Sequence, residues 1–508
     1  MKITSLNFFA FLGITALVYY IFPKRFRWIS LLISSLFFFL LASYKVAFYF
    51  VIGVLISYIG ALLIDKKCKT EKSKKIILIS TIFCEMAGLF VLKYINIIPN
   101  TINGFGKLFN IDLNFANINL IAPIGISYYT LSIIAYVVDV YRTTIPAEKN
   151  IFKYTLYSCY YPCLISGPFI RYSEMKKEFF ENECLDWNNI FKGFHRIVYG
   201  LLKKMVIADN VAILVKMIFE DISIFSGGYI ILGLMLYALQ IYCDFSGCMD
   251  IVIGASKLYG VKIPENFESP FFSKNLSEFW RRWHITLGLW GKDYIMYPLL
   301  KSEKFQKLGK ATKKRFGKDI GKKIPVIISI FVLWLFIGIW HGASYKYIFA
   351  AGMLPWIYFS TSELLDKFIK KLTEKLHINT EKFSFHLFQS LRTLILMCII
   401  WLFAISPTLL KSRNIIKNLF VVSNINLIEF LNKNIFNDVY KFMAIFFSII
   451  GLTIVDYLKY KEKDVGEKFN SQGIIFRYLL LFGMISIILI FGVYGPGYNP
   501  ADFIYGGF

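Results

Sequence analysis

Charged side chains are scarce in this 508-residue chain. They make up 18% of the residues, against about 25% in a soluble globular protein, whereas hydrophobic residues make up 56%. The longest hydrophilic stretch, residues 301–323, is too short to bury a core of its own. The shortage of charge excludes a soluble enzyme and predicts an all-α polytopic membrane protein, built as one integral domain over residues 1–508.

Several kinds of chemical site are also missing. The eight cysteines show no repeated C-x-x-C spacing, so we expect them to be small buried hydrophobes and expect no metal site. Ser166 and Ser246 lack the strand–turn–helix context of a serine nucleophile elbow, and no phosphate-binding loop is present. We therefore expect no bound cofactor and no serine acyl-enzyme. No inverted repeat typical of many transporters is visible.

Positive charge, by contrast, is plentiful, with a net charge of +24. The lysines cluster in short loops between apolar runs, which is the positive-inside pattern of membrane proteins. This pattern predicts contact with anionic membrane lipid and no role in nucleic-acid binding. Basic residues at 24–27 and 65–75 mark the cytoplasmic side, so the N-terminus and the loop 99–116 are expected outside.

Apolar runs predict about twelve membrane spans, and the abundant Phe and Tyr are expected to face lipid and its interfaces. The expected spans are residues 4–22, 29–43, 46–64, 76–98, 119–138, 191–218, 227–242, 324–341, 345–365, 387–405, 437–458 and 475–494. Three stretches, 151–170, 244–260 and 276–300, are only half-apolar and are interrupted by Gly, Pro or charge. Irregular backbone persists in hydrocarbon only where it is buried in protein or lines a cavity. Re-entrant helices and a solvated tunnel are therefore expected.

Two of the five histidines lie where an ionisable side chain is costly. His341 follows Trp340 at the end of the apolar run 324–340, which is about long enough to cross a bilayer core of roughly 30 Å. His284 lies in FWRRWHITLGLW. An ionisable group at membrane depth is by default a functional-site hypothesis.

The segment around His284 is predicted to form one amphipathic helix. Asn275 followed by Glu278 resembles a capping box and predicts the helix start. At 100° per residue an apolar stripe forms, and His284 falls at its edge. The stripe contains Leu276, Trp280, Trp283, Leu287 and Trp290. A plain anchoring helix, whose histidine only bonds a carbonyl group, is the alternative.

Charged residues near these histidines suggest further candidates. Asp244 and Asp250 lie in a polar break, where a carboxylate could orient an imidazole or form a structural salt bridge. Asp293 is expected to pair with Lys292 or Arg282 and so hold the re-entrant helix. The candidate tunnel-lining residues are Trp280, Arg282, Asp293, Trp340, Asp244 and Ser246.

The basic loop 301–323 holds ten Lys or Arg, and Lys304, Lys307 and Lys310 recur at every third position. It predicts either a solvated cytoplasmic face that attracts lipid or a dock for an anionic acyl donor. Such a donor could be coenzyme A, through its phosphates, or an acidic carrier protein.

Two long motifs, NLSEFWRRWHITLGLWGKDYIMYPL and GIWHGASYKYIFAAGM, resemble the central motifs of membrane-bound O-acyltransferases. Three upstream stretches resemble the bacterial branch that acetylates alginate or D-alanylates teichoic acid, and the C-terminal DFIYGGF resembles the aromatic tail of its alginate-type members. The upstream stretches are APIGISYYTLSIIAYVVDVYR, YPCLISGPFIRY and YCDFSGCMDIVIG. The resemblance is good over about residues 120–355 and weak at both ends.

This resemblance implies a ring of about 11–12 helices around a central tunnel. The catalytic core would be residues 119–355, between N-terminal spans 1–118 and C-terminal spans 356–508. His341 takes the position regarded as catalytic, with His284 as its companion. Lys292 before Asp293 departs from the usual arginine–aspartate pair, and a lysine-rich stretch replaces a double glycine.

Acyl transfer from a thioester to a hydroxyl needs a base and a group that stabilises the oxyanion. A neutral imidazole suits the first task, because its ordinary pKa is about 6.5 and burial lowers it. We therefore predict that His341 is the base and that His284 holds the oxyanion or the acceptor; His284 as the base is the second choice.

The sequence thus predicts a multi-pass plasma-membrane acyltransferase. It would transfer an acyl group, expected to be acetyl, to an exported or cell-surface polysaccharide. The donor would be a cytoplasmic thioester, either acetyl-CoA or an acyl carrier protein. An extracellular acyltransferase partner would complete the transfer. Three alternatives remain: D-alanyl transfer to teichoic acid from a carrier protein, a proton-coupled transporter, and a catalytically silent scaffold.

Overall fold

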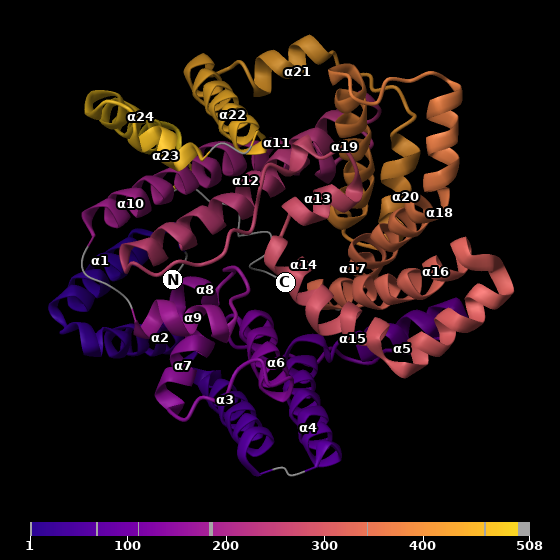
Figure 1. Cartoon of the computed structure of the whole chain (residues 1–508). Helices are drawn as coiled ribbons and strands as arrows, with labels where there is room; N and C mark the ends of the chain where they lie inside the picture. The colour runs from indigo at the N-terminus through magenta and orange to yellow at the C-terminus, as the bar shows by residue number, and fades with distance from the viewer. Residues whose placement is uncertain are drawn as a thin grey trace. The chain divides into compact units, whose positions relative to one another are not determined.

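Helices form all the regular secondary structure in the described part of the chain. The structure is a computed structural model that describes residues 3–67, 70–109, 111–181, 186–342, 344–461 and 464–495. Across these ranges the β-structure is limited to an isolated antiparallel bridge between Phe267 and Trp283. The all-α prediction is confirmed (Figure 1). The C-terminal DFIYGGF lies outside the described residues.

Among the described residues, eight helical segments are long and apolar enough to cross a membrane, which makes the chain a multi-pass membrane protein. They are Lys24–Ala42, Tyr44–Lys66, Glu71–Tyr94, Gly228–Leu258, Glu303–His341, Phe383–Ile405, Val439–Tyr460 and Ile474–Phe491. Two expected spans, 4–22 and 119–138, correspond to shorter apolar helices, Leu6–Ile21 and Ile126–Tyr141. A third, 191–218, is divided by a π-helical turn, Leu202–Ala208. The described helices that are long and apolar enough to span a membrane are therefore fewer than the twelve spans expected from the apolar runs.

The chain divides into two compact units. The first comprises residues 1–197 and 249–264, and the second residues 198–248 and 265–508. Helices α10 (Trp187–Leu201) and α12 (Gly228–Leu258) contribute residues to both. The other helices of the first unit are α1 (Leu6–Ile21), α2 (Arg27–Ser43), α3 (Ala47–Leu62), α4 (Glu71–Leu89), α5 (Ile97–Leu108), α6 (Ile126–Tyr141), α7 (Ile151–Cys159), α8 (Tyr161–Leu164) and α9 (Tyr172–Phe180).

The second unit carries the remaining helices. They are α11 (Asp209–Glu220), α13 (Leu276–Arg282), α14 (Ile285–Gly291), α15 (Tyr297–Lys301), α16 (Glu303–His341), α17 (Tyr345–Tyr347), α18 (Leu354–Lys375), α19 (Phe383–Ile405), α20 (Leu409–Asn418), α21 (Leu427–Asn434), α22 (Val439–Tyr460), α23 (Val465–Asn470) and α24 (Ile474–Phe491). Short 3-10 turns cover Lys24–Phe26, Tyr44–Val46 and Pro270–Phe272. Wider π-helical turns cover Leu63–Lys67 (η3), Phe90–Tyr94 (η4), Leu202–Ala208 (η5), Lys292–Met296 (η7) and Ile348–Met353 (η8).

Tyrosines fill the interior of the first unit. The Tyr259 hydroxyl lies 2.6 Å from Thr15 Oγ1 and 2.5 Å from the Tyr161 hydroxyl, and all three residues are buried. Tyr154 donates to Ser57 Oγ over 2.7 Å. A buried hydroxyl needs such a partner, and these pairs supply it. The prediction that aromatic residues face lipid therefore holds for side chains such as Phe83, which is 71% exposed, but is wrong for these tyrosines.

The lysine-rich stretch predicted as a loop is helical. Helix α16 consists of two legs joined at Gly317, whose φ of +78° favours glycine. Thr312 Oγ1 in the first leg donates to the Gly321 carbonyl in the second over 2.7 Å, and Gly309 lies beside Pro325. The two legs therefore form a helical hairpin. Lysine is a good helix former, which explains why the charge run did not break the helix.

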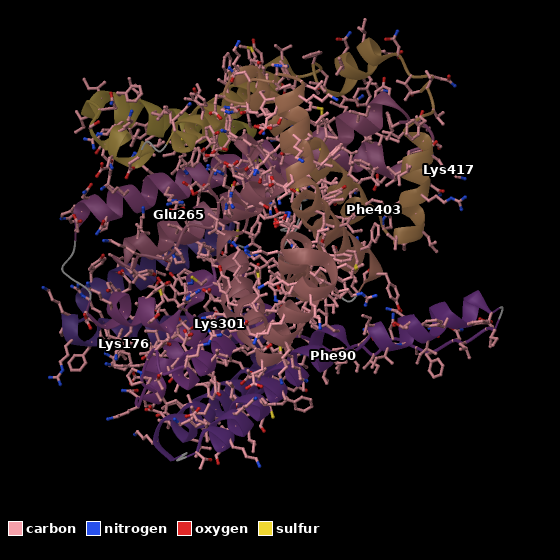
Figure 2. All side chains as sticks on the ribbon, turned by 45° about the vertical axis from the view of Figure 1, so that its right-hand side comes forward. Phe90, Lys176, Glu265, Lys301, Phe403 and Lys417 are labelled. Atoms are coloured by element: carbon pink, nitrogen blue, oxygen red, sulfur yellow. The ribbon has the colours of Figure 1, made fainter. Side chains whose placement is uncertain are left out.

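Lysines generally keep to the periphery of the helices. Figure 2 labels Lys176 on α9 and Lys417 on α20, and both side chains are exposed. Exposed apolar side chains, such as Ile475 and Phe482 of α24, would meet lipid. This distribution agrees with the sparse, peripheral charge expected of a membrane protein.

Within the first unit, α10 and α12 approach each other through glycine. A Cβ atom added at Gly254 would lie 2.6 Å from the Gly193 carbonyl oxygen, and one added at Gly193 would lie 2.8 Å from the Gly254 oxygen. Small residues allow two backbones to pack this closely in membrane proteins.

We expect Gly254→Ala to lower the thermal unfolding temperature of the detergent-solubilised protein, because its methyl group meets backbone and the helices must separate. Overpacking of this kind costs about 1–3 kcal/mol. Gly451→Ala on α22 is the matched control, since a Cβ there has no neighbour within 4 Å. Equal unfolding temperatures for the two variants would contradict the close approach.

Candidate active site

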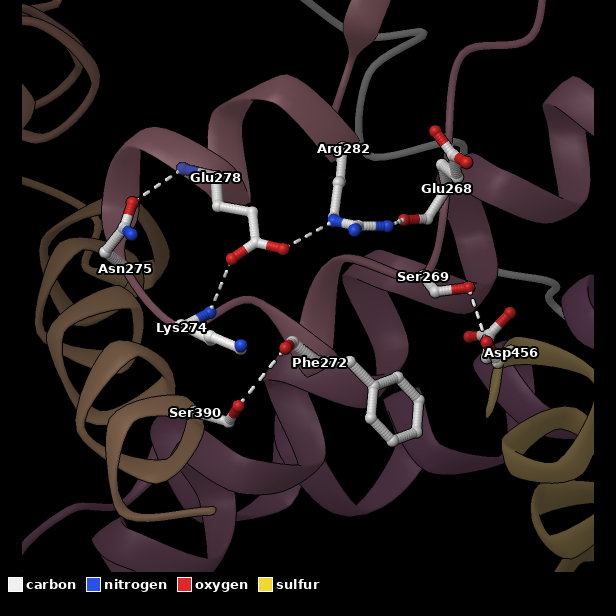
Figure 3. A network of polar contacts seen from close by, with 9 residues as sticks. All are labelled: Glu268, Ser269, Phe272, Lys274, Asn275, Glu278, Arg282, Ser390 and Asp456. Carbon is white, nitrogen blue, oxygen red and sulfur yellow. Dashed lines mark hydrogen bonds and ion pairs between the residues drawn. The ribbon is translucent and has the colours of Figure 1, made fainter. Parts of the chain in front are cut away.

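The segment that carries His284 begins with a capped helix. Asn275 Oδ1 accepts the Glu278 backbone N–H over 2.8 Å and so caps α13, which confirms the predicted start. The Glu278 carboxylate accepts the Lys274 backbone N–H over 2.9 Å and forms an ion pair with Arg282 over 3.0 Å (Figure 3). Arg282 thus pairs with Glu278, whereas Asp293 interacts electrostatically with Lys292, the other partner that the sequence predicts for it.

The helix breaks at His284, which was predicted to lie within a continuous helix. Helix α13 ends at Arg282, and α14 begins at Ile285. Between them His284 adopts φ +49° and ψ +50°, the left-handed region that few residues other than glycine occupy. Such a conformation costs about 1–3 kcal/mol and persists only where the surroundings enforce it. The imidazole is therefore placed by a turn and not by the helical stripe.

His341 occupies the C-terminal end of α16. It is 7% exposed, and its ring centroid lies 5.1 Å from that of Trp340. Gly338, one turn earlier on α16, approaches Gly352 of η8 closely, because a Cβ there would lie 3.1 Å from the Gly352 Cα. This contact allows the end of α16 to pack tightly against η8.

Both histidines line one cavity of about 260 Å³ in the second unit. Its apolar wall includes Leu287, Leu333 and Ile337. Its polar part includes Arg281, Lys292 and the exposed Glu363 of α18. Lys323 Nζ of α16 lies 3.9 Å from the Glu363 carboxylate, so this polar part adjoins the basic portion of α16. The cavity therefore extends from cationic side chains to the two imidazoles.

Aromatic rings pack around His284. The Phe245 ring of α12 meets the imidazole edge-on at a centroid distance of 4.8 Å, and the Trp340 ring lies 6.2 Å away. His284 is 4% exposed and lies outside the eight candidate spans. Burial, together with the nearby His341, holds the pKa of His284 well below its usual value of 6.5. His284 is therefore a neutral imidazole at physiological pH.

The other candidate tunnel residues are divided between the cavity and its surroundings. Trp280 lines the cavity, and its buried indole N–H has no hydrogen-bond partner among the described residues. Trp340 lies beside both imidazoles. Of the described lining residues, none is Arg282, Asp293, Asp244 or Ser246.

Asp244 and Ser246 belong instead to a buried polar cluster on α12 and η5. Lys204 Nζ lies 2.5 Å from the Asp244 carboxylate and 2.8 Å from that of Asp209, and each side chain is 2–3% exposed. Lys203 Nζ donates to Ser246 Oγ over 3.3 Å. Asp250, in the first unit, pairs with Arg196 over 2.9 Å. For both aspartates the structure favours the salt-bridge alternative over a role in orienting an imidazole.

Lys304, Lys307 and Lys310 are exposed on the first leg of α16. They do not line the cavity among its described residues. A role in donor docking stays a prediction. In the part of the chain that the structure describes, no group of three or more His, Cys, Asp or Glu residues could hold a metal ion.

Comparisons with known proteins bear on this site directly. A model of the membrane-bound O-acyltransferase family, MBOAT, matches residues 142–312. A probable alginate O-acetylase of Pseudomonas syringae pv. tomato is 28% identical over 470 residues, which cover 92% of this chain and 84% of that protein. A peptidoglycan O-acetyltransferase of Helicobacter pylori is 28% identical over 472 residues, covering 85% and 83% of the two chains.

The chain belongs to the membrane-bound O-acyltransferase family. It is therefore an acyltransferase, and neither a transporter nor a catalytically silent scaffold. A third relative is a teichoic acid D-alanyltransferase of Bacillus subtilis, 29% identical over 240 residues that cover 45% of this chain and 56% of that protein. The family model ends before His341, whereas His284 lies inside the matched range.

The sequence does not reveal the partners of His284 or the lysines of the buried polar cluster. Asn266 and Thr286 hydrogen-bond around His284. Asn266 stands outside the quoted motifs, and Thr286 lies inside the motif of His284 but is not distinguished there by its residue type. Lys203 and Lys204 were overlooked although they interrupt the expected apolar span 191–218. A cation inside an apolar run is itself a signal, because it demands a buried partner.

We expect Lys204→Met to destabilise the protein strongly, because it leaves the Asp209 and Asp244 carboxylates buried without their cation. Removing one partner of a buried ion pair costs about 3–5 kcal/mol. Thermal unfolding in detergent measures this loss, and Lys304→Met, at an exposed lysine, is the matched control.

Adding Asp209→Asn and Asp244→Asn to Lys204→Met should recover part of the lost stability, since the triple variant buries no net charge. Full stability of Lys204→Met alone would show that the cluster does not hold the fold.

Proposed function

We propose that this MBOAT protein transfers an acetyl group from a cytoplasmic thioester to a hydroxyl group of an envelope polysaccharide. The observation that carries the proposal is the meeting of His284 and His341 on one buried cavity, although 57 positions separate them in the sequence. Two relatives that cover most of the chain are named as acetyl-transferring enzymes of alginate and peptidoglycan, which supports acetyl as the group and polysaccharide as the acceptor.

In this proposal His341 is the general base. It would accept the proton of the acceptor hydroxyl as oxygen attacks the thioester carbon, a contribution of about 10²–10⁴-fold. His284 would stabilise the negative charge that develops on the carbonyl oxygen. The low exposure of both imidazoles favours this division, because a buried pair does not accept two positive charges and one ring must stay neutral.

The lining of the cavity suits a thioester. The apolar wall of Leu287, Leu333 and Ile337 would exclude water, which would otherwise hydrolyse the donor. Arg281 and Lys292 place positive charge where an anionic donor would approach.

The donor is proposed to enter from the cytoplasm. The positive-inside rule assigns the lysine-rich leg of α16 to that side, and Lys323 lies close to Glu363 at the polar part of the cavity. Acetyl-CoA and acyl carrier protein are both candidate donors. Each presents negative charge to Lys304, Lys307 and Lys310.

The acceptor would be reached from outside a plasma membrane, with an extracellular acyltransferase partner completing the transfer to polymer. D-alanyl transfer to teichoic acid is the second candidate function, favoured by the Bacillus subtilis relative. The two candidate functions differ in the acyl group and in the acceptor, but both would use His341 as the base and the same cavity.

We expect His341→Asn to lower the rate of ester formation on envelope polysaccharide by about 10²–10⁴-fold, since the base is lost. Ester content of polysaccharide from expressing cells measures the effect. His377→Asn is the matched control, because His377 is exposed at the end of α18. Unchanged ester content in well-folded His341→Asn would refute the proposed chemistry.

We expect Lys304→Gln, Lys307→Gln and Lys310→Gln together to raise the KM for the donor several-fold with little change in kcat, because they would act on encounter and not on the chemical step. The effect should fade at high salt, as screening already weakens these charges. A triple change of the exposed Lys371, Lys375 and Lys382 to Gln is the control. Equal KM values for the two triple variants would assign the α16 lysines to lipid contact.

A further inference from the structure

The turn at His284 is clamped by a second segment of the chain. The Glu268 backbone N–H donates to the Arg282 carbonyl over 2.9 Å, and the Ile285 N–H donates to the Asn266 carbonyl over 3.1 Å. The isolated bridge between Phe267 and Trp283 lies between these two bonds. Pairing on both sides of His284 therefore enforces its left-handed backbone.

The Asn266 side chain belongs to the same clamp, and its amide orientation is fixed. Its Oδ1 accepts the Thr286 backbone N–H over 3.0 Å and the Thr286 hydroxyl over 2.9 Å. A backbone N–H can only donate, so the atom facing it must be the oxygen of the amide. These two bonds occupy both lone pairs of Oδ1.

The amide nitrogen then decides how His284 carries its proton. Asn266 Nδ2 lies 3.2 Å from His284 Nδ1, and Nδ2 can only donate. His284 Nδ1 must therefore be the acceptor. The opposite assignment, with Nδ1–H donating to Oδ1 over 3.3 Å, needs a third donor on an oxygen that already accepts two.

We propose that Asn266, supported by Thr286, is a positioning residue that fixes His284 as the tautomer with its proton on Nε2. His284 then offers an N–H donor from the side of the ring opposite Asn266, and Nε2 cannot serve as a base. The tautomer follows from the clamp alone, whereas its use in acyl transfer rests on the proposed function.

The clamp divides the chemistry between the two histidines. The acceptor oxygen forms a bond to the thioester carbon and gives its proton to His341. The carbonyl electron pair moves to oxygen, which accepts a hydrogen bond from His284 Nε2–H. The carbon–sulfur bond then breaks, and the thiolate leaves with the proton held by His341. Atoms and charge balance without any further reactant, and His284 keeps its proton throughout.

The surroundings of His284 are consistent with a constant neutral donor. His341 of α16 is the titratable group whose charge acts on His284, and α12 presents the uncharged Phe245 ring to it. Arg281, Lys292 and Glu363 line the same cavity.

Asn266→Asp tests the assignment, because a carboxylate accepts hydrogen bonds but has none to donate to Nδ1. The neutral His284 should then move its proton to Nδ1 and lose the Nε2–H donor. Nitrogen-15 NMR of the full-length, histidine-labelled protein in detergent distinguishes the tautomers. Five histidines keep the assignment simple, and His284→Gln identifies the signal. Protonated Nδ1 in the wild-type protein would overturn the inference.

The same variant should also alter a pH profile. We expect Asn266→Asp to slow thiol release from acetyl-CoA in reconstituted vesicles about 10²–10³-fold near neutral pH, the usual loss for one oxyanion donor. The rate should recover toward acid pH, because the carboxylate raises the pKa of His284 and the imidazolium carries both N–H groups. A merely structural role predicts an equal loss at every pH, which would contradict the proposed positioning.

Two further variants keep the test decisive. Asn275→Asp makes the same chemical change at the α13 cap, where Asp also caps well, and should leave tautomer and rate unchanged. Thr286→Val frees one lone pair of Oδ1 and should give a mixture of tautomers, even if Asn266→Asp fails to fold. A wild-type protein that carries Nε2–H but releases no thiol would refute the proposed function and leave the tautomer assignment standing.

Discussion

Hydrocarbon offers no hydrogen bonds, and this constraint decides where the polar side chains of this chain are placed. Lys204 is held between two aspartates, and tyrosine hydroxyls in the first unit pair with Thr15 or with one another. A buried polar group without such a partner costs several kcal/mol. The cavity of the second unit, by contrast, is lined by both imidazoles together with Arg281 and Lys292.

The two histidines meet this constraint in different ways. His341 ends a long helix, so its backbone is ordinary and its position follows from the length of α16. His284 sits in a left-handed turn that would be unfavourable alone and is held by pairing with residues 266–268. Backbone strain of this kind is stored where a side chain must be aimed. The site thus combines one imidazole at the end of a long helix with a second on a clamped turn.

Much of the site could be predicted from the sequence, because an intramembrane histidine is costly and therefore conspicuous. His341 and His284 were found by that cost, and the α13 cap was found from Asn275 and Glu278. The break at His284 could not be found, since the apolar stripe runs through it without interruption. It depends on Asn266, whose proximity to Thr286 arises only when the chain folds.

The fold was predictable at the level of class and less so in its details. Apolar runs identified the long spans, because their length matches the bilayer. The charge density of the lysine-rich stretch predicts a loop, but the high helix propensity of lysine prevails in the structure. The π-helical turn at Leu202–Ala208 contains Lys203 and Lys204, but two lysines in an apolar run do not reveal a change of helix type, so the sequence predicts one helix over 191–218.

The lysine-bearing leg of α16 cannot be drawn through hydrocarbon cheaply, because each lysine at the bilayer centre costs about 2.5–3.5 kcal/mol. During biogenesis the second leg must therefore thread inward from the side on which the lysines remain. The residues from Ile324 to His341 rise about 27 Å as an α-helix, close to the full hydrocarbon thickness. Insertion of the second leg alone would therefore place the His341 imidazole near the opposite face of the hydrocarbon core.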